Sequence, residues 1–356
     1  MHRSMYKKVY RTIKRTGEQT PRFKARRQTL CLLVVLIFTI SLLGGCNDQK
    51  RSEQMSETRL LLNTYCTITI HGDVDSELLK EAFDLCAELE ALLSMTIEGS
   101  DVWHINNAGG RPVQVDPKTI EVIKAGLEFG DLTDGMFDIT IGRLSRLWDF
   151  NGEPYLPSAG ELEEALVTVD YRQVSIDSNT VQLLNPDAWI DLGAVAKGYI
   201  CDKIAGFLIG RGVSGALVDL GGDVVTVGNR QDGTPWRIGV REPFGEKGEL
   251  LGVLEVTGLS VISSGTYERQ FDVNGVRYHH ILDPNTGMPV KTGVVSATVV
   301  VESALTGEGI STSIILNRAG GLEYLFYHFP GFVGAVVVLE NGELLWFGDL
   351  EFVKQG

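Results

Sequence analysis

The chain has 356 residues, and 32 basic against 46 acidic side chains give it a formal net charge of −14. Ten basic residues but only one acid, Glu18, lie in the first 27 positions, so the rest of the chain carries 22 basic and 45 acidic residues, a charge near −23. This charge argues against binding of nucleic acid or anionic lipid by the body of the protein. The favoured interpretation of the acidity is a solvated surface that keeps an exported protein soluble.

The first 45 residues have the three parts of a secretory signal. Basic residues up to position 27 precede an apolar run at 30–43, and the small residues Gly44 and Gly45 follow. The pattern predicts a signal peptide at 1–45. The apolar run is shorter than the roughly 20 residues of a membrane-spanning helix, and a retained membrane anchor is the alternative.

Leu43-Gly44-Gly45-Cys46 at the end of that run resembles a bacterial lipobox. The resemblance implies cleavage before Cys46 and lipidation of this cysteine by fatty acyl chains such as palmitate. Two or more chains anchor a protein stably. We therefore expect a lipoprotein on the extracytoplasmic face of the cell membrane.

Residues 46–58 are polar and without periodicity, which predicts a flexible tether. The globular domain is expected over 59–356. Its three cysteines, Cys66, Cys86 and Cys201, lie in apolar contexts without a CxxC pair. Their odd number and wide spacing predict buried free thiols rather than disulfides or metal ligands.

The globular part predicts an α+β fold with mixed sheets and packed helices. Apolar periodicity favours helices at 75–93 (capped by Ser76), 117–133, 161–167, 191–211 after a Gly-rich turn, and 305–316. Strands are expected at 64–71, 174–176, 180–184, 215–219, 224–227, 236–240, 252–256, 260–263, 269–273, 296–301, 334–339 and 344–347. Because the strands cluster and the helices do not alternate with them, a doubly wound parallel sheet is disfavoured.

Gly-rich turns at 191–199, 219–223, 263–265 and 283–287 could bring backbone N–H groups close to a phosphate. No GxGxxG follows a strand, and no GxxxxGK[ST] is present. Any phosphate is therefore bound by an architecture other than a Rossmann fold or a P-loop.

Seven segments occur in a fixed order across 59–350: NTYCTI (63–68), DGMFDITIG (134–142, followed by Leu147-Trp148), VDYR (169–172), IDLGAVAKGY (190–199), VDLGGD (218–223), SGTYER (264–269) and HHILDPNTG (279–287). Together they resemble the ApbE family, the FAD:protein FMN transferases. The resemblance implies the family's flavin transferase architecture, which is related to the T-fold.

The resemblance further implies an enzyme that uses FAD as donor substrate and a bound Mg²⁺. Such an enzyme transfers FMN to a Ser or Thr hydroxyl of an exported flavoprotein, of the redox-complex subunit type, and releases AMP. Two alternatives stay open: an FAD pyrophosphatase that hydrolyses FAD to FMN and AMP, and a non-catalytic flavin-binding lipoprotein.

By the same resemblance, the FAD contacts fall on Leu62, Met136, Phe137, Asp138, Asp191, Lys197 and Ile281. Met136 and Phe137 offer apolar surface to a ring, although core packing is their simpler role. Asp138 and Asp191 can accept hydrogen bonds from ribose or adenine or help to position metal-bound waters, and Lys197 can neutralise a phosphate oxygen.

The metal positions implied by the resemblance are the carbonyl of Ala194 and the side chains of Glu308 and Thr312. Glu308 stands where the family usually has Asp, and its extra methylene displaces the carboxylate by about 1.5 Å. Mg²⁺ tolerates distorted geometry poorly. Either the flanking Gly307 and Gly309 let the backbone compensate, or the site prefers Mn²⁺ or Ca²⁺. Glu308 as a solvated helix residue is the simpler alternative.

His279-His280 is the only His pair, at a predicted strand end just before Ile281. A histidine beside a phosphoryl centre can deprotonate the acceptor hydroxyl. His280 is therefore the candidate catalytic residue, with a purely structural role as the alternative.

Overall fold

The computed structural model describes residues 54–72, 75–246, 248–317 and 322–355. The predicted signal peptide, Cys46 and residues 46–53 of the tether lie outside these ranges. No helix among the described residues is both long enough and apolar enough to cross a membrane.

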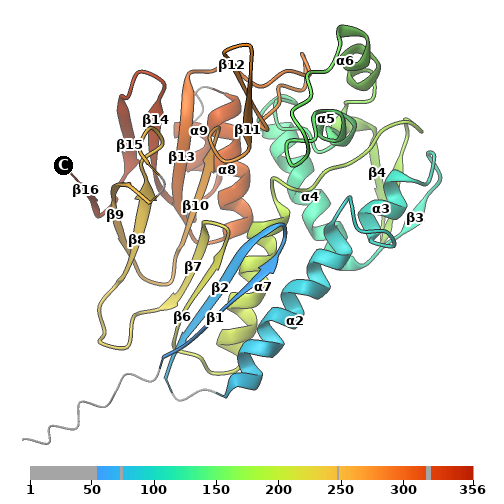
Figure 1. The fold of residues 1–356 in the computed structure, drawn as a ribbon. Helices are drawn as coiled ribbons and strands as arrows, with labels where there is room; N and C mark the ends of the chain where they lie inside the picture. Colours follow the sequence, from blue (N-terminus) through green and yellow to red (C-terminus); the bar gives the residue numbers. More distant parts are fainter. Residues whose placement is uncertain (1–53, 73–74, 247, 318–321, 356) are drawn as a thin grey trace, which may run out of the picture. The chain divides into compact units, whose positions relative to one another are not determined.

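An eight-stranded sheet is the centre of the fold (Figure 1). Its strands are, in spatial order, β1 (Gln54–Leu61), β2 (Thr64–His71), β6 (Gly215–Leu220), β7 (Asp223–Gly228), β10 (Ser260–Gly265), β13 (Val294–Val301), β14 (Phe332–Leu339) and β15 (Leu344–Gly348). The pairings between the named strands are antiparallel. The α+β class is thus confirmed, and its sheets are antiparallel where mixed ones were expected.

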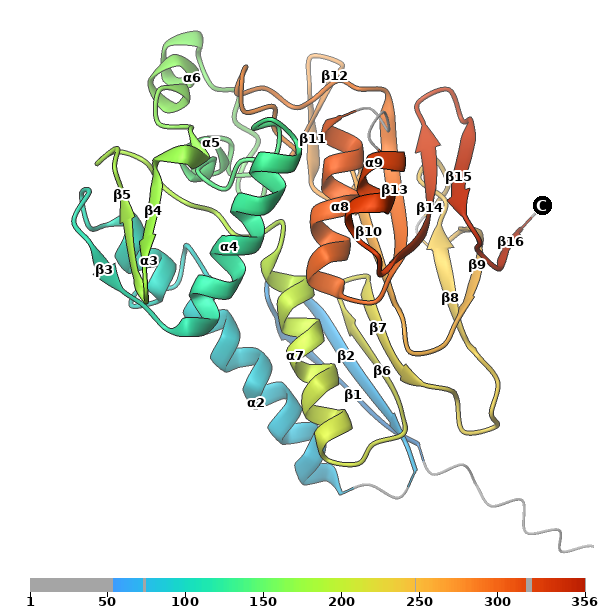
Figure 2. The ribbon, with the colours of Figure 1, turned by 180° about the vertical axis from the view of Figure 1, so that it is seen from behind.

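Helices cover one face of this sheet (Figure 2). They are α2 (Ser76–Leu93), α4 (Pro117–Leu132), α7 (Ala196–Gly210) and α8 (Ala304–Leu316). Side chains alternate along each strand, so Val299 and Val301 of β13 join the core under the helices while Val300 points to the other face. A three-stranded sheet of β8 (Trp236–Arg241), β9 (Leu250–Val256) and β16 (Phe352–Lys354) covers that second face.

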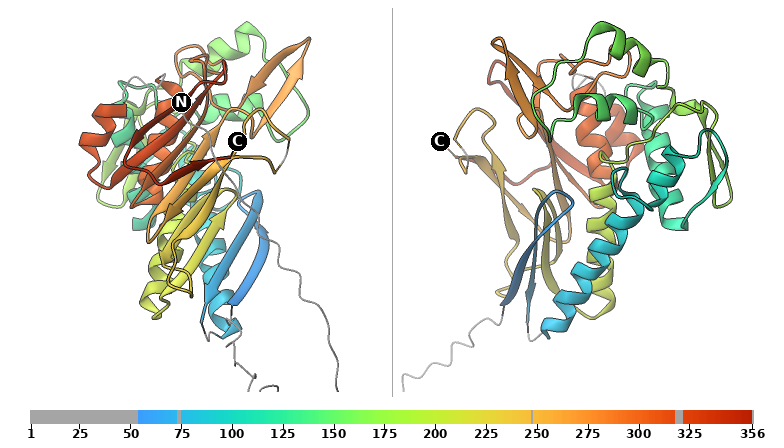
Figure 3. Two further views of the ribbon diagram at one scale, coloured as in Figure 1. Left: turned by 90° about the vertical axis from the view of Figure 1, so that its left-hand side faces the viewer. Right: turned by 45° about the vertical axis from the view of Figure 1, so that its right-hand side comes forward.

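Smaller elements surround the large sheet. The hairpin of β11 (Gln270–Val273) and β12 (Val276–His279) lies at the same end as α5 (Gly142–Trp148) and α6 (Ala159–Leu166), as Figure 3 shows. A cluster of Trp148, Phe271 and Tyr278 packs them together. The remaining elements are α3 (Asp101–Asn106), β3 (Val113–Gln114), a 3₁₀ turn (Tyr171–Gln173), β4 (Val174–Asp177), β5 (Thr180–Leu183) and α9 (Leu322–His328).

The boundaries differ from the sequence prediction at the N-terminal end of the domain. β1 begins at Gln54 and pairs with β2, so residues 54–58 belong to the sheet rather than to a flexible tether. The cap of α2 is Asp75, whose carboxylate accepts the N–H of Glu77 at 3.1 Å, and not Ser76. The three described cysteines are buried free thiols, as predicted.

Candidate active site

One cavity of about 380 Å³ opens beside the helical face of the sheet. Its walls come from segments far apart in the sequence: the β1–β2 turn, the end of α2, the loop before α5, the start of α7, the β10–β11 turn and the middle of α8. Eleven residues predicted for the site line it: Leu62, Met136, Phe137, Asp138, Asp191, Ala194, Lys197, His280, Ile281, Glu308 and Thr312. The fold therefore brings the predicted residues together, and their individual roles stay predictions.

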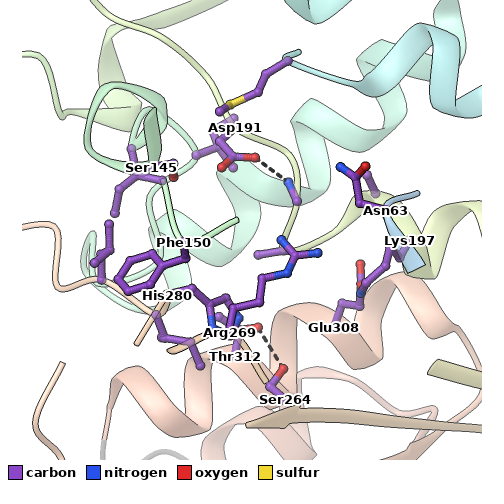
Figure 4. Close-up of a pocket in the computed structure, with 18 of the residues that line it drawn as sticks. Asn63, Ser145, Phe150, Asp191, Lys197, Ser264, Arg269, His280, Glu308 and Thr312 are labelled. Carbon is purple, nitrogen blue, oxygen red and sulfur yellow. Dashed lines mark hydrogen bonds and ion pairs between the residues drawn. The ribbon is translucent and has the colours of Figure 1, made fainter. Parts of the chain in front are cut away.

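The ammonium of Lys197 lies between two carboxylates on neighbouring elements, and Figure 4 shows Lys197 beside one of them, Glu308. It pairs with Asp223 at the start of β7 and with Glu308 on α8. Burial favours a lower Lys197 pKa, but the two carboxylates outweigh it and hold that pKa well above its usual value. Lys197 thus neutralises protein carboxylates here, which leaves it less available for the phosphate contact predicted for it.

Glu308 is a buried residue with an unused oxygen, and not the solvated helix residue of the alternative. Its side chain is 4 % exposed, and its Oε2 has no hydrogen-bond partner in the described residues. Burial raises the pKa of its carboxyl to about 7. A carboxylate oxygen placed in this way favours a nearby cation.

The oxygen donors here fit a hard divalent cation. Thr312 lies one helical turn after Glu308, so the two side chains share a face of α8, and Ala194 lines the same cavity. Asp223 adds a second carboxylate beside Glu308. In the described ranges no group of three or more Asp, Glu, His or Cys forms a metal cage by itself, so a bound ion would depend on backbone, hydroxyl and substrate oxygens.

The glycines on either side of Glu308 serve packing rather than backbone adjustment. Both lie inside regular α8 without positive φ. A Cβ at Gly309 would overlap the ring of Phe129, and one at Gly307 would press on Ile262 and Val301. The helix shows no local adjustment of the backbone at these two glycines, and the preferred ion stays a prediction.

Asp138 and Phe137 are structural neighbours of the cavity. The Asp138 carboxylate accepts the backbone N–H of Thr140 at 2.7 Å, its hydroxyl at 2.5 Å and the N–H of Tyr171 at 2.9 Å. These bonds hold the loop in place and leave little capacity for ribose or adenine. Phe137 is 3 % exposed and packs against Phe129 with ring centroids 5.5 Å apart, so its ring belongs to the core.

Asp191 and Leu62, two further predicted FAD contacts, line the cavity. Asp191 uses one oxygen to accept the N–H of Gly193 at 2.9 Å. Leu62 has a left-handed backbone with φ of 54°, and the carboxylate of Glu90 accepts its N–H at 2.9 Å. Non-glycine residues rarely adopt this conformation without a fixed partner, so Glu90 stabilises the turn that borders the cavity.

His280 carries an imidazole that stays neutral. Burial lowers its pKa to about 3, and Arg269 contributes to the same shift. Its Nδ1 is buried without a partner in the described part of the chain. A neutral imidazole has a nitrogen that can accept the hydroxyl proton, but a pKa of about 3 makes it a weak base at neutral pH. His279 lies outside the cavity lining, and its Nε2 lies 3.1 Å from the carbonyl oxygen of Val290.

The lining residues that were not predicted as site residues include Phe150, Asp223, Glu268 and Arg269. Asp223 and the pair Glu268-Arg269 ended two of the seven family segments, so the signal for them was present. Phe150 stacks on Trp148 with ring centroids 5.4 Å apart and an interplanar angle of 11°. Nothing in its sequence context distinguished this ring from ordinary core.

The described residues define an α+β protein with a cavity lined by apolar side chains, by carboxylates and by the cations Lys197 and Arg269. The profile of the ApbE family matches residues 62–330, and the chain belongs to that family. A curated relative from Treponema pallidum, named FAD:protein FMN transferase, is 31 % identical over 83 % of this chain and 88 % of its own.

Two further relatives agree. A Klebsiella pneumoniae protein of the same name is 37 % identical over 66 % of this chain and 73 % of its own. The crystal structure of the ApbE protein from Thermotoga maritima superposes with a TM-score of 0.75 at 34 % identity, and the match covers 82 % of this chain and 96 % of that one.

Proposed function

We propose that this protein is a transferase that moves FMN from FAD onto a Ser or Thr hydroxyl of an exported protein. The observation that carries the proposal is the cavity that gathers all ten residues implied by the family resemblance together with His280, in a chain similar to proteins named FAD:protein FMN transferase. The cavity combines apolar surface with oxygen donors and cations, as a flavin joined to a pyrophosphate requires.

In the proposed reaction, the acceptor hydroxyl attacks the phosphorus of the FMN half of FAD. The new bond is the P–O bond of a phosphodiester, and the pyrophosphate P–O bond to AMP breaks. The hydroxyl proton passes to the neutral His280, which lies in the cavity wall next to Ile281. AMP leaves with the electrons of the broken bond.

The Ala194 carbonyl, Glu308 and Thr312 would hold the divalent cation, Mg²⁺ or, given the longer Glu308, Mn²⁺ or Ca²⁺. When bound, it supplies charge that neutralises pyrophosphate oxygens. Glu308 and Asp223 contribute negative charge to hold it, and Lys197 balances that charge when no cation is present.

Lipidation of Cys46 would place this reaction outside the cytoplasm, on the membrane surface. The acceptor would be an exported flavoprotein of the redox-complex subunit type. Its hydroxyl-bearing loop would fill the mouth of the cavity and keep water from the phosphorus.

The proposal is tested by FAD cleavage with the metal removed. EDTA should abolish AMP release, and Mg²⁺ or Mn²⁺ should restore it. Glu308→Ala should lower the rate about 100-fold, the order of a lost transition-state charge contact, while FAD binding weakens less. Glu302→Ala, a change at an exposed carboxylate just before α8, is the matched control. Full activity of Glu308→Ala would contradict the metal assignment.

A further inference from the structure

Arg269 is a cavity residue that has no role in the reaction as described so far. It lies in the turn between β10 and β11, and its side chain is exposed to the cavity. Its backbone carbonyl accepts the N–H of His280 at 3.1 Å. This bond fixes the start of the Arg269 side chain beside the candidate base. Figure 4 shows the side chain extending from that position toward the centre of the cavity.

The Arg269 guanidinium makes no ion pair and no hydrogen bond to any residue in the ranges that the structure describes. Lys197 differs in this respect, because Asp223 and Glu308 both occupy its ammonium. A free guanidinium inside a cavity is a ready site for an anion, since its planar donors match two oxygens of a phosphate.

Resting on the proposed function, we infer that Arg269, and not Lys197, is the cation that binds the phosphate of the FMN half of FAD. The phosphorus under attack must lie near the base that takes the hydroxyl proton, and Arg269 is held beside that base by the His280 bond. The guanidinium charge also reaches the imidazole, because it helps to lower the pKa of His280. Arg269 therefore has both the position and the unused charge for the reacting phosphate.

The test compares two flavins that differ only in that phosphate, FMN and riboflavin. Their dissociation constants are measured by quenching of flavin fluorescence with the full chain and Mg²⁺. Arg269→Gln should weaken FMN binding about 10- to 100-fold, the worth of charge-assisted hydrogen bonds, and leave riboflavin binding unchanged. Arg269→Lys should recover part of the lost FMN affinity, because lysine keeps the positive charge but cannot donate two parallel N–H groups to the phosphate.

Arg146→Gln is the matched control, since Arg146 also lines the cavity as an exposed arginine and its loss removes the same charge. It should keep the preference for FMN. Unchanged riboflavin binding shows that each variant is folded.

Three results would overturn the inference. The first is that the wild-type protein binds FMN no more tightly than riboflavin. The second is that Arg269→Gln keeps the wild-type preference for FMN. The third is that Arg146→Gln loses this preference as much as Arg269→Gln does. Failure of the proposed function is read separately, as wild-type protein that binds FMN in this way but neither cleaves FAD nor labels an acceptor.

Discussion

Lys197 lies between two buried carboxylates, and the pairing determines what this residue can contribute. Asp223 and Glu308 are each 4 % exposed, whereas Lys197 is 28 % exposed. Two buried carboxylates without a cation would repel each other strongly. The ammonium therefore holds together the part of the site in which a divalent cation is proposed.

Lys197→Met should lower the free energy of unfolding by roughly 3–5 kcal/mol, because it leaves buried charges unpaired. Added Mg²⁺ should recover more stability in this variant than in the wild type, since the ion then replaces the ammonium. Urea unfolding with and without Mg²⁺ measures both effects. Lys203→Met, on the same helix but paired with the exposed Glu121, should change stability by less than about 1 kcal/mol. If both variants lose the same unfolding free energy and respond equally to Mg²⁺, Lys197 does not stabilise the two buried carboxylates as described.

His279 predicts a dependence of stability on pH. Burial lowers its pKa to about 4 from the usual 6.5. Below pH 6.5 the unfolded chain therefore binds a proton that the folded chain does not, and stability falls as the pH decreases toward 4. The loss from this residue is up to about 3 kcal/mol. The urea midpoint should fall less between pH 7 and pH 4.5 for His279→Gln than for the wild type. An equal fall in both proteins would show that His279 does not cause the loss of stability.

At the scale of elements, α8 carries the site because it packs closely on several sides. Gly309 faces Phe129 of α4, Gly307 faces the sheet, and Gly198 of α7 lies against the carbonyl of Ala304. Small residues at these contacts let α8 approach α4, α7 and β13. This approach buries Glu308 and places Thr312 in the cavity wall.

Gly309→Ala should destabilise the fold by about 1–3 kcal/mol, since the new methyl overlaps the Phe129 ring and overpacks the core. Gly206→Ala on α7 is the control, because nothing lies within 4 Å of its added Cβ. That change should be neutral or stabilising by up to about 1 kcal/mol. Thermal unfolding of both variants measures the difference, and a tolerated Gly309→Ala would show that α8 is packed more loosely than described.

The long apolar elements could be predicted from the sequence, whereas the edge strand β1 and the short helices α3 and α5 could not. β13 and β14 are buried on both faces, so their apolar runs were recognisable. β1 is an edge strand of the large sheet. Its exposed positions are Gln54, Ser56, Thr58 and Leu60. Because the sequence of this strand is mostly polar, it does not show the alternation of apolar and polar residues that predicts a strand. α3 and α5 have six and seven residues, too few to show helical periodicity.

The membership in the ApbE family could also be predicted, and it is confirmed by the family match and the relatives. The pairing of Lys197 with Asp223 and Glu308 could not. These partners are 26 and 111 residues away in the chain, and no spacing rule relates them. The same holds for Arg269, whose lack of a partner is visible only when its surroundings are assembled.

At the scale of the whole molecule, the proposed lipid anchor and the catalytic domain are separable. The described residues from Gln54 onward belong to one compact unit, and Cys46 lies outside it. Cys46→Ser should therefore yield a protein that is unprocessed or released from the membrane, yet folded and able to bind FAD. Membrane fractionation and flavin binding check the two halves of this expectation. Stable membrane association of a processed Cys46→Ser protein would contradict lipidation at that residue.

Transfer and hydrolysis share every step except the identity of the attacking hydroxyl. The cavity offers His280 to either one, so we propose that the choice comes from the acceptor protein, whose loop would fill the cavity mouth. Without an acceptor, turnover of FAD should be slow. With the acceptor present, His280→Ala should slow the transfer of FMN while FAD stays bound.

The most direct measurement counts AMP and covalent flavin in one reaction. The protein is incubated with FAD, Mg²⁺ and exported flavoprotein candidates, and in-gel flavin fluorescence is compared with AMP released. We predict equal amounts of AMP and of FMN bound to one Ser or Thr of the acceptor, and little AMP without it. Rapid AMP release without acceptor, and no protein-bound flavin for any exported redox partner, would contradict the transferase account and assign the site to FAD hydrolysis.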